Sequence, residues 1–310
     1  MGRPDFLSPL HLHAPLDAFP ASGSEQSPNP EQLLNPNKSA MLIDQFRFAG
    51  NRPTGLLLAN WDFLYLGVDL RLGSIPLTNG IIPIASIVPR YFGFALAGGI
   101  SDTVLTWHLP RPLYVPPGVQ LYARFVRQDV FAAGNRDTSI DNVGFSAVGR
   151  SMPSDYPVPK KIWVPWATAT QCKSPIGGAD IQRFVSTDQE LANPNTELLH
   201  VTQLNGFNCS RPFDGIFGGA SQPTRSPLTA QMTLSSGKML MRDPTDFFGL
   251  FPTDRGSLNL EAVLQSKEFV RAELELTPPN AADDDQFSIA YTTIGMIGYR
   301  EVQTPIGVQP

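Results

Sequence analysis

The sequence predicts an all-β protein made of two tandem antiparallel β-sandwiches, with an extended N-terminal arm and few short helices. Three observations carry this prediction. The 310 residues include 30 prolines and 26 glycines, which leave room for strands but little room for long helices. Several runs alternate apolar and polar residues with the period of two of a half-buried strand. The chain also ends its two halves in the same way, near residues 150 and 300.

The clearest strand pair lies in residues 101–128, SDTVLTWHLPRPLYVPPGVQLYARFVRQ. Strands are expected at residues 103–109 and 119–128. The proline-rich corner between them, from Pro110 to Gly118, cannot continue a helix and sets φ for a turn. The second strand has an apolar face and a mixed face, with Leu121, Ala123 and Phe125 on one side and Tyr122, Arg124 and Val126 on the other. The mixed face is a candidate contact surface.

The predicted organisation has four segments: an arm at residues 1–38, a first β-sandwich at 39–155, a linker at 156–190 and a second β-sandwich at 191–310. The arm is rich in Pro, Ser, Asn and Gln and shows no sustained period, so we expect it to be extended. The first sandwich has strand-like runs at residues 39–48, 55–72, 81–89 and 91–100, then the strand pair above and a closing run at 143–150.

The linker is rich in proline, and Trp163 and Trp166 are expected to pin it to one domain. A short helix is predicted near Thr187–Leu199, because Asp188 and Glu190 suit its first turn. Strand-like runs follow in the second sandwich at residues 198–204, 230–234, 258–264, 270–277 and 287–300. Both halves end with an alternating strand, a polar loop and a closing strand, about 150 residues apart, which predicts an internal duplication.

The low charge of the sequence favours a subunit that is covered by neighbours. Charged residues make up 16% of the chain, against about 25% in ordinary soluble domains. Mean hydropathy is −0.10, and no apolar run approaches the roughly 18–20 residues that cross a bilayer. The net charge of −5 argues against a general electrostatic binder of nucleic acid, and no sequence-specific binding is predicted. The N-terminal residues predict neither a signal peptide nor a myristoyl anchor.

No catalytic residue is predicted. The four histidines, His11, His13, His108 and His200, are a poor supply for catalysis, and His108 is expected to have a structural role beside Trp107. The segment GFSAVG is one residue too long for a nucleophile elbow. The glycine clusters fit no phosphate-binding loop.

No cofactor or metal site is predicted either. His11 and His13 lack further converging ligands in the arm. Asp283, Asp284 and Asp285 could bind calcium, but a solvated hairpin loop is the favoured interpretation. Cys172 and Cys209 are too few for a disulfide framework or a four-ligand zinc site, and two buried thiols are expected. Whether they pair is left open.

The strand pair around LPRPLYVPPGVQLYARF and the paired endings VGFSAVGR and IAYTTIGMIGYR resemble jelly-roll viral coat proteins. They are most similar to the double jelly-roll major capsid proteins of tailless icosahedral, lipid-containing phages, archaeal viruses and adenovirus-like viruses. The resemblance covers residues 39–310. It implies two jelly rolls per chain and homotrimers of pseudo-hexagonal outline that tile a capsid. It also implies a virion location after synthesis in the host cytoplasm, with minor capsid proteins and an internal membrane as further partners.

Two other classes of function are considered. A carbohydrate-binding or fibre module made of tandem β-sandwiches is the alternative, with Trp61, Trp107, Trp163 and Trp166 stacking on sugars in a row on one surface. Tryptophans buried between sheets favour the coat protein instead. A β-sandwich hydrolase would need a pair of acids, for which Glu261, Glu273 and Glu275 are the candidates in strands.

Overall fold

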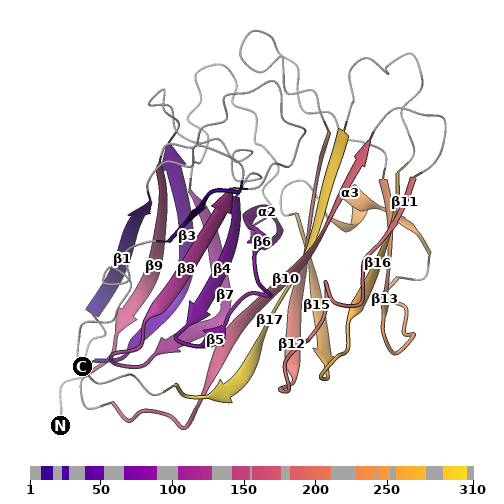
Figure 1. Ribbon diagram of the computed structural model, residues 1–310. Helices are drawn as coiled ribbons and strands as arrows, with labels where there is room; N and C mark the ends of the chain where they lie inside the picture. Colours follow the sequence, from indigo (N-terminus) through magenta and orange to yellow (C-terminus); the bar gives the residue numbers. More distant parts are fainter. Residues whose placement is uncertain are drawn as a thin grey trace. The chain divides into compact units, whose positions relative to one another are not determined.

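The computed structural model describes residues 8–16, 23–27, 39–51, 66–88, 104–127, 142–153, 156–175, 182–210, 228–241, 243–251, 256–276 and 289–305 (Figure 1). Its strands pair in antiparallel sheets, and the two helices of the described residues have four residues each, so the predicted fold class is confirmed. In the part of the chain that is described, no helix has both the length and the apolar character needed to span a bilayer.

The first roll is formed by β1 (Ser8–Leu16), β2 (Glu25–Gln26), β3 (Met41–Asn51), β4 (Leu66–Leu72), β5 (Ile75–Pro76), β6 (Ile82–Pro83), α2 (Ile84–Ile87), β7 (Leu105–Val115), β8 (Leu121–Arg127) and β9 (Asn142–Ser151). One sheet has the order β1-β9-β3-β7, of which Figure 1 shows β1, β9 and β3 side by side. The facing sheet has the order β2-β8-β4-β5, and β6 also pairs with β4.

The second roll is formed by β10 (Lys161–Pro175), β11 (Gln182–Val185), β12 (Leu199–Ser210), β13 (Leu228–Leu234), β14 (Thr245–Asp246), α3 (Phe247–Leu250), β15 (Ser257–Leu264), β16 (Val270–Leu276) and β17 (Ile289–Gln303). Its sheets have the orders β10-β17-β12-β15 and β11-β16-β13-β14. These orders repeat those of the first roll, except that β14, which pairs with β13 as β6 pairs with β4, takes the place of β5. The match agrees with the predicted duplication. The short helices also correspond, since α2 follows the strand that pairs with β4 and α3 follows the strand that pairs with β13.

By its contacts the chain forms two compact units that nearly follow this division. The first unit also takes in the start of β10, up to Ala167, and the end of β17, from Ile297. Strands β1 and β2 lie within the predicted arm, and β10 and β11 lie within the predicted linker. The predicted boundaries at residues 38, 155 and 190 stay a prediction.

An aromatic cluster fills the core of the first roll. The ring of Phe145 in β9 lies 5.5 Å from Phe46, 5.6 Å from Phe48 and 5.7 Å from Phe125, measured between ring centroids. All four side chains are fully buried. Phe125 belongs to β8, so the cluster joins the two sheets, and such ring pairs stabilise a core beyond the burial of their area.

The proline-rich stretch differs from the prediction at one point. β7 runs without a break through Pro110 and Pro112, so the predicted corner is wrong over these residues. The turn is confined to Pro116–Val119, where the Val119 N–H donates to the Pro116 carbonyl at 3.2 Å and Gly118 has φ 71°. A positive φ at the third residue is the mark of a type II turn. This turn carries the chain from one sheet to the other.

Residues 109–112 form a bulge in β7. Ile43 pairs with Leu113 and Gln45 with His108, so these residues and Asp44 have no partner in the ladder. The second roll is irregular at the corresponding position, between Val201 and Gln203 of β12. A bulge bends an edge strand and protects it from pairing with other chains.

The predicted helix near Thr187–Leu199 is wrong, because this segment forms turns and a bridge. Its centre is Asn193, which is fully buried. The Asn193 Nδ2 donates to the carbonyls of Glu197 at 2.8 Å and Leu264 at 3.0 Å. Pro194 follows directly, and a residue before proline is disfavoured in the helical region.

Replacing Gly149 by alanine tests the close packing at the bulge. Gly149 pairs with Ile43, and a Cβ at this position would lie 1.9 Å from the Leu42 carbonyl oxygen. Because backbone must move, we expect Gly149→Ala to lower the free energy of unfolding by about 2–3 kcal/mol in urea titrations. Gly249→Ala is the control, since a Cβ in α3 would lie 3.7 Å from Asp246. Equal urea midpoints for both variants would contradict the register at the bulge.

Candidate functional site

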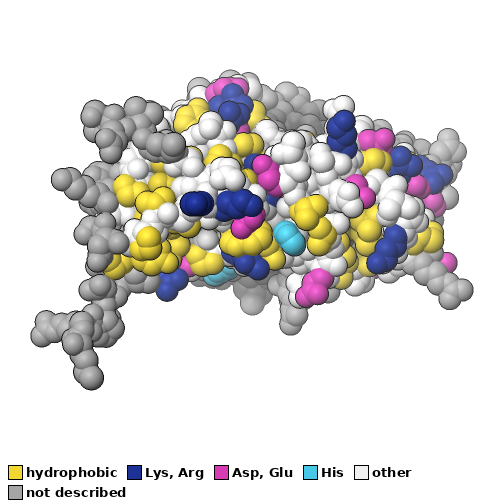
Figure 2. Space-filling model, turned by 90° about the horizontal axis from the view of Figure 1, so that it is seen from below, with side chains coloured by type: hydrophobic (Ala, Val, Ile, Leu, Met, Phe, Trp, Pro, Cys, Tyr) yellow, Lys and Arg dark blue, Asp and Glu magenta, His cyan; other side chains and the backbone are white. Residues whose placement is uncertain are grey.

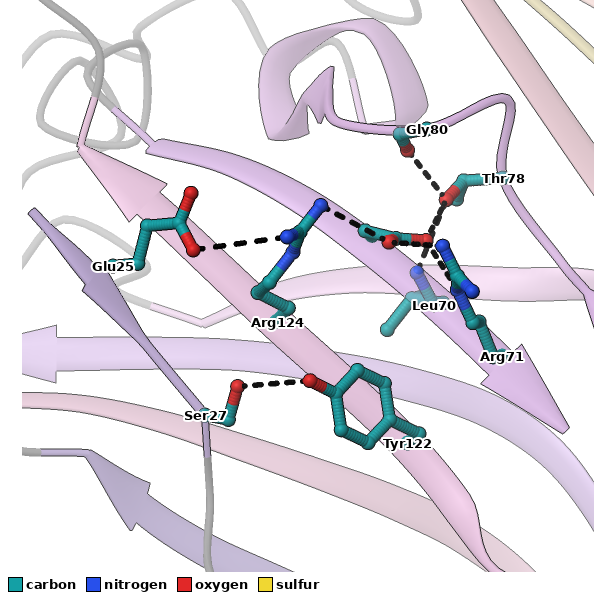
Figure 3. A network of polar contacts seen from close by, with 9 residues as sticks. Glu25, Ser27, Leu70, Arg71, Thr78, Gly80, Tyr122 and Arg124 are labelled. Carbon is teal, nitrogen blue, oxygen red and sulfur yellow. Dashed lines mark hydrogen bonds and ion pairs between the residues drawn. The ribbon is translucent and has the colours of Figure 1, made fainter. Parts of the chain in front are cut away.

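A buried carboxylate organises the outer face of the sheet β2-β8-β4-β5. The side chain of Asp69 in β4 is 1% exposed. Its Oδ2 lies 3.0 Å from Nη2 of Arg71 in the same strand and 3.5 Å from Nη2 of Arg124 in β8. Figure 3 shows the two guanidinium groups reaching this carboxylate from neighbouring strands. The hydrogen bond with Asp69, and then the charge of its carboxylate, raise the pKa of Arg71.

The Thr78 hydroxyl ties the following segment to the same strand. It accepts a hydrogen bond from the Leu70 N–H at 3.0 Å and lies 2.8 Å from the Gly80 carbonyl oxygen, to which it donates. It also lies 3.5 Å from Oδ1 of Asp69. Thr78 is fully buried, so these bonds satisfy a polar group that would otherwise be costly.

Residues 23–27 lie on the predicted contact surface of β8. The Gly23 N–H donates to the Arg127 carbonyl at 2.9 Å. The Glu25 carboxylate lies 3.7 Å from Arg124, and the Ser27 hydroxyl lies 3.4 Å from the Tyr122 hydroxyl (Figure 3). Val126, the third predicted member, is only 9% exposed. Side chains of the chain's own N-terminal segment thus contact part of this face, and its role as a contact surface for other chains stays a prediction.

A second cluster surrounds Arg111 at the bulge of β7. Its guanidinium carbon lies 4.6 Å from the ring centroid of Trp163 and 4.4 Å from that of Tyr299, and its Nη2 donates to the Tyr299 hydroxyl at 3.3 Å. The two rings meet edge to face at 5.3 Å. Sequence reasoning missed this cation–π cluster. The sequence feature that could have indicated this cluster is an arginine between two prolines, Pro110 and Pro112. These residues lie in the bulge, and Arg111 is exposed there.

The three tryptophans that the structure describes do not form a row on one surface. Trp107 and Trp166 are 3% and 2% exposed. Trp163 is half-buried against Tyr299, and Trp61 lies outside the described residues. The positions of the described tryptophans do not favour sugar stacking.

The histidines and acids form no constellation in the described ranges. His11 and His108 are exposed and His200 is half-buried, while the side chain of His13 is not among those described. His108 is thus not a core residue, in contrast to its buried neighbour Trp107. Among the described residues, no three of His, Cys, Asp and Glu gather as metal ligands. The predicted loop of Asp283, Asp284 and Asp285 lies outside them.

The candidate acid pair is dispersed. Glu261 belongs to β15, whereas Glu273 and Glu275 belong to β16 in the other sheet of the second roll. Glu273 is occupied by an ion pair with Arg183. A glycosidase needs two carboxyl groups that face one another across a cleft. These three residues do not form such a pair.

Cys172 is a free, half-buried thiol in β10. Burial, and then the charge of Glu190, raise its pKa from 9.0 to about 11. Cys172 is therefore half-buried and not the fully buried thiol that was predicted, and its reactive thiolate form is scarce at neutral pH. Cys209 lies in β12, and its side chain is not among those described.

The surface seen in Figure 2 mixes charges of both signs. Lys and Arg side chains lie beside Asp and Glu side chains and between hydrophobic ones, and the described residues on this face gather no broad basic patch. This pattern agrees with the net charge of −5 and does not resemble a nucleic-acid footprint.

No family model matches the sequence, and no curated protein sequence matches it significantly. Solved structures are similar in fold. PBCV-1 VP54, as fitted into a reconstruction of the virophage Sputnik, is 8% identical, with 99% of this chain and 97% of that chain covered at a TM-score of 0.52. A chain of the PBCV-1 virus capsid is 9% identical, with the same coverage and a TM-score of 0.50. The resemblance to double jelly-roll proteins is thus confirmed at the level of fold.

Removing the charge of Asp69 should destabilise the first roll. Asp69→Asn keeps the size of the side chain but leaves Arg71 and Arg124 without their shared anion. Because both guanidinium groups are partly hydrated, we expect a loss of about 1–2 kcal/mol in the free energy of unfolding.

The matched control is Asp44→Asn. Asp44 pairs with Arg150 at 3.3 Å, but the two side chains are 36% and 45% exposed. We expect a loss of about 0.5 kcal/mol or less for this surface pair. Urea titration of both variants decides the matter, and equal losses would contradict a special role for the buried carboxylate.

Cys172 should react slowly in the folded protein. In a Cys209→Ala variant it is the one thiol of the chain. At pH 8 we expect alkylation about 100-fold slower than in urea, because the thiolate fraction falls with the raised pKa. The stabilisation by the neutral thiol is complete below its ordinary pKa and is lost as pH rises towards 11. Rapid alkylation of the folded variant at pH 8 would show that Cys172 is accessible and ionised.

Proposed function

We propose that this protein is a coat protein of an icosahedral virus or phage, with a structural and not an enzymatic role. One observation carries the proposal. Two jelly rolls in tandem match a chain of the PBCV-1 virus capsid over 99% of this protein and 97% of that chain. Fold alone does not define function, so the proposal also rests on the chemistry of the described residues.

The described polar clusters support a structural role. An ion pair of Asp69 joins strands of one sheet, and the guanidinium of Arg111 lies against the rings of Trp163 and Tyr299. These side chains hold parts of the chain together. The low share of charged residues, 16%, suits a subunit whose sides are covered by its neighbours.

The assembly unit that we propose is a homotrimer. Each chain supplies two similar rolls, so three chains supply six similar units and give a pseudo-hexagonal outline that can tile a shell. Obligate contacts of this kind bury roughly 2,000 Å² or more. The proposed location is the virion, after synthesis in the host cytoplasm, and further partners are minor capsid proteins and an internal membrane.

The carbohydrate-binding alternative is not favoured. Trp107 and Trp166 are buried, and the face of Trp163 is covered by Arg111. Sugar stacking needs an exposed ring face, and two of these three side chains are buried.

Light scattering on the purified protein tests the assembly. We expect a mass of three chains of 33.8 kDa each that persists at micromolar concentration, because an obligate interface resembles a bisected core. Electron microscopy of the same fraction should show pseudo-hexagonal particles. A monomer across the concentration series would contradict the trimer. Retention of the protein on immobilised glycans would instead support the alternative.

A further inference from the structure

The two rolls carry short edge strands at equivalent places. β2 is the edge strand of the sheet β2-β8-β4-β5, and β11 is the edge strand of β11-β16-β13-β14. Glu25 pairs with Val126 in the first ladder, and Arg183 pairs with Glu275 in the second. β8 and β16 are also aligned in the same register on β4 and β13. Glu25 and Arg183 therefore occupy the same position in the two rolls.

Both edge strands are joined to the sheet by an ion pair at the same position of the ladder. Glu25 pairs diagonally with Arg124, two residues before its direct partner in the ladder. Arg183 pairs diagonally with Glu273, again two residues before its direct partner. The charges are reversed between the rolls. The first roll has the acid on the edge strand and the base on the sheet, and the second has the opposite arrangement.

The surroundings strengthen this difference. In the first roll Nη2 of Arg124 also lies 3.5 Å from Oδ2 of the buried Asp69. In the second roll both Glu273 and Glu275 raise the pKa of Arg183. An acidic strand placed on β16 would thus meet two carboxylates, and a basic strand placed on β8 would meet a fixed guanidinium. Like charges that face each other across a ladder are destabilising.

We propose that this charge reversal makes the two sheet edges selective, so that the β8 edge accepts the acidic strand β2 of this protein and the β16 edge rejects it. Both edge strands pair antiparallel to their neighbours, and backbone hydrogen bonds alone do not distinguish an acidic strand from a basic one. Specificity of this kind arises from a repulsive element as well as an attractive one. The partner of the β8 edge is β2, an N-terminal strand of this chain. Where many copies assemble, as in the proposed coat, the carboxylates of Glu273 and Glu275 repel β2 from the β16 edge.

Hydrogen exchange of the full chain tests the proposal, with neutral and reversed variants at each edge. Glu25→Gln and Arg183→Gln remove the attraction, whereas Glu25→Arg and Arg183→Glu add repulsion. We expect the amides of residues 23–27 or 182–186 to exchange about twofold faster in the neutral variants and about fivefold faster in the reversed ones. The difference should shrink in 1 M salt. Glu25 and Arg183 are 54% and 65% exposed, so the variants should fold.

A charge swap completes the test. In a Glu275→Val background, which gives β16 the neutral residue of the first roll, Arg183→Glu should accelerate exchange and Arg183→Glu with Glu273→Arg should restore it to within about twofold. Lys238→Glu, in an exposed turn, is the control and should leave both edges unchanged. If reversed and neutral variants exchange alike, or if the swap fails to restore protection, the ion pairs do not determine which strand each edge accepts, and the proposal is overturned.

Discussion

The first roll depends on closing two sheets face to face, and Phe145 is the centre of that contact. Its ring meets two rings of its own sheet and one of the facing sheet, and all of them are fully buried. Sheets packed about 10 Å apart need such interdigitating side chains. The polar features follow from this packing, because a sheet with an apolar inner face presents Asp69 and Arg124 on its outer side.

The two rolls have similar strand orders, but different side chains fill their cores. At corresponding positions the first roll has Phe48 in β3 and Val88 after α2, whereas the second has Gly206 in β12 and Phe251 after α3. A Cβ at Gly206 would lie 2.2 Å from the Phe251 ring, so the ring takes the space above the glycine. Large and small residues are thus traded between two elements, which a packed core tolerates when total volume is kept. The edge ion pairs show the same principle with charge in place of size.

Much of the fold could be predicted from the sequence, because strand period and turn residues act locally. The alternation in residues 121–127 and 270–276 placed β8 and β16, and the similar endings indicated the duplication. The rest depends on contacts that no local pattern encodes. Pro110 and Pro112 fit a strand only because β7 bulges at an edge. Asp69 is buried because two arginines and the segment of Thr78 converge on it. The prediction of a helix near Thr187–Leu199 failed because the buried side-chain amide of Asn193 binds backbone carbonyls of Glu197 and Leu264 and so fixes that segment as a loop.

The bulge at β7 has a consequence for the history of the chain. Both rolls lose register at the same place, after Ile43 and after Val201. The predicted duplication would account for both with a single ancestral irregularity, which would then be older than the doubling of the chain. β7 has Pro110 and Pro112 beside Arg111, whereas the corresponding strand β15 has no proline. On the same hypothesis, this difference arose after the doubling.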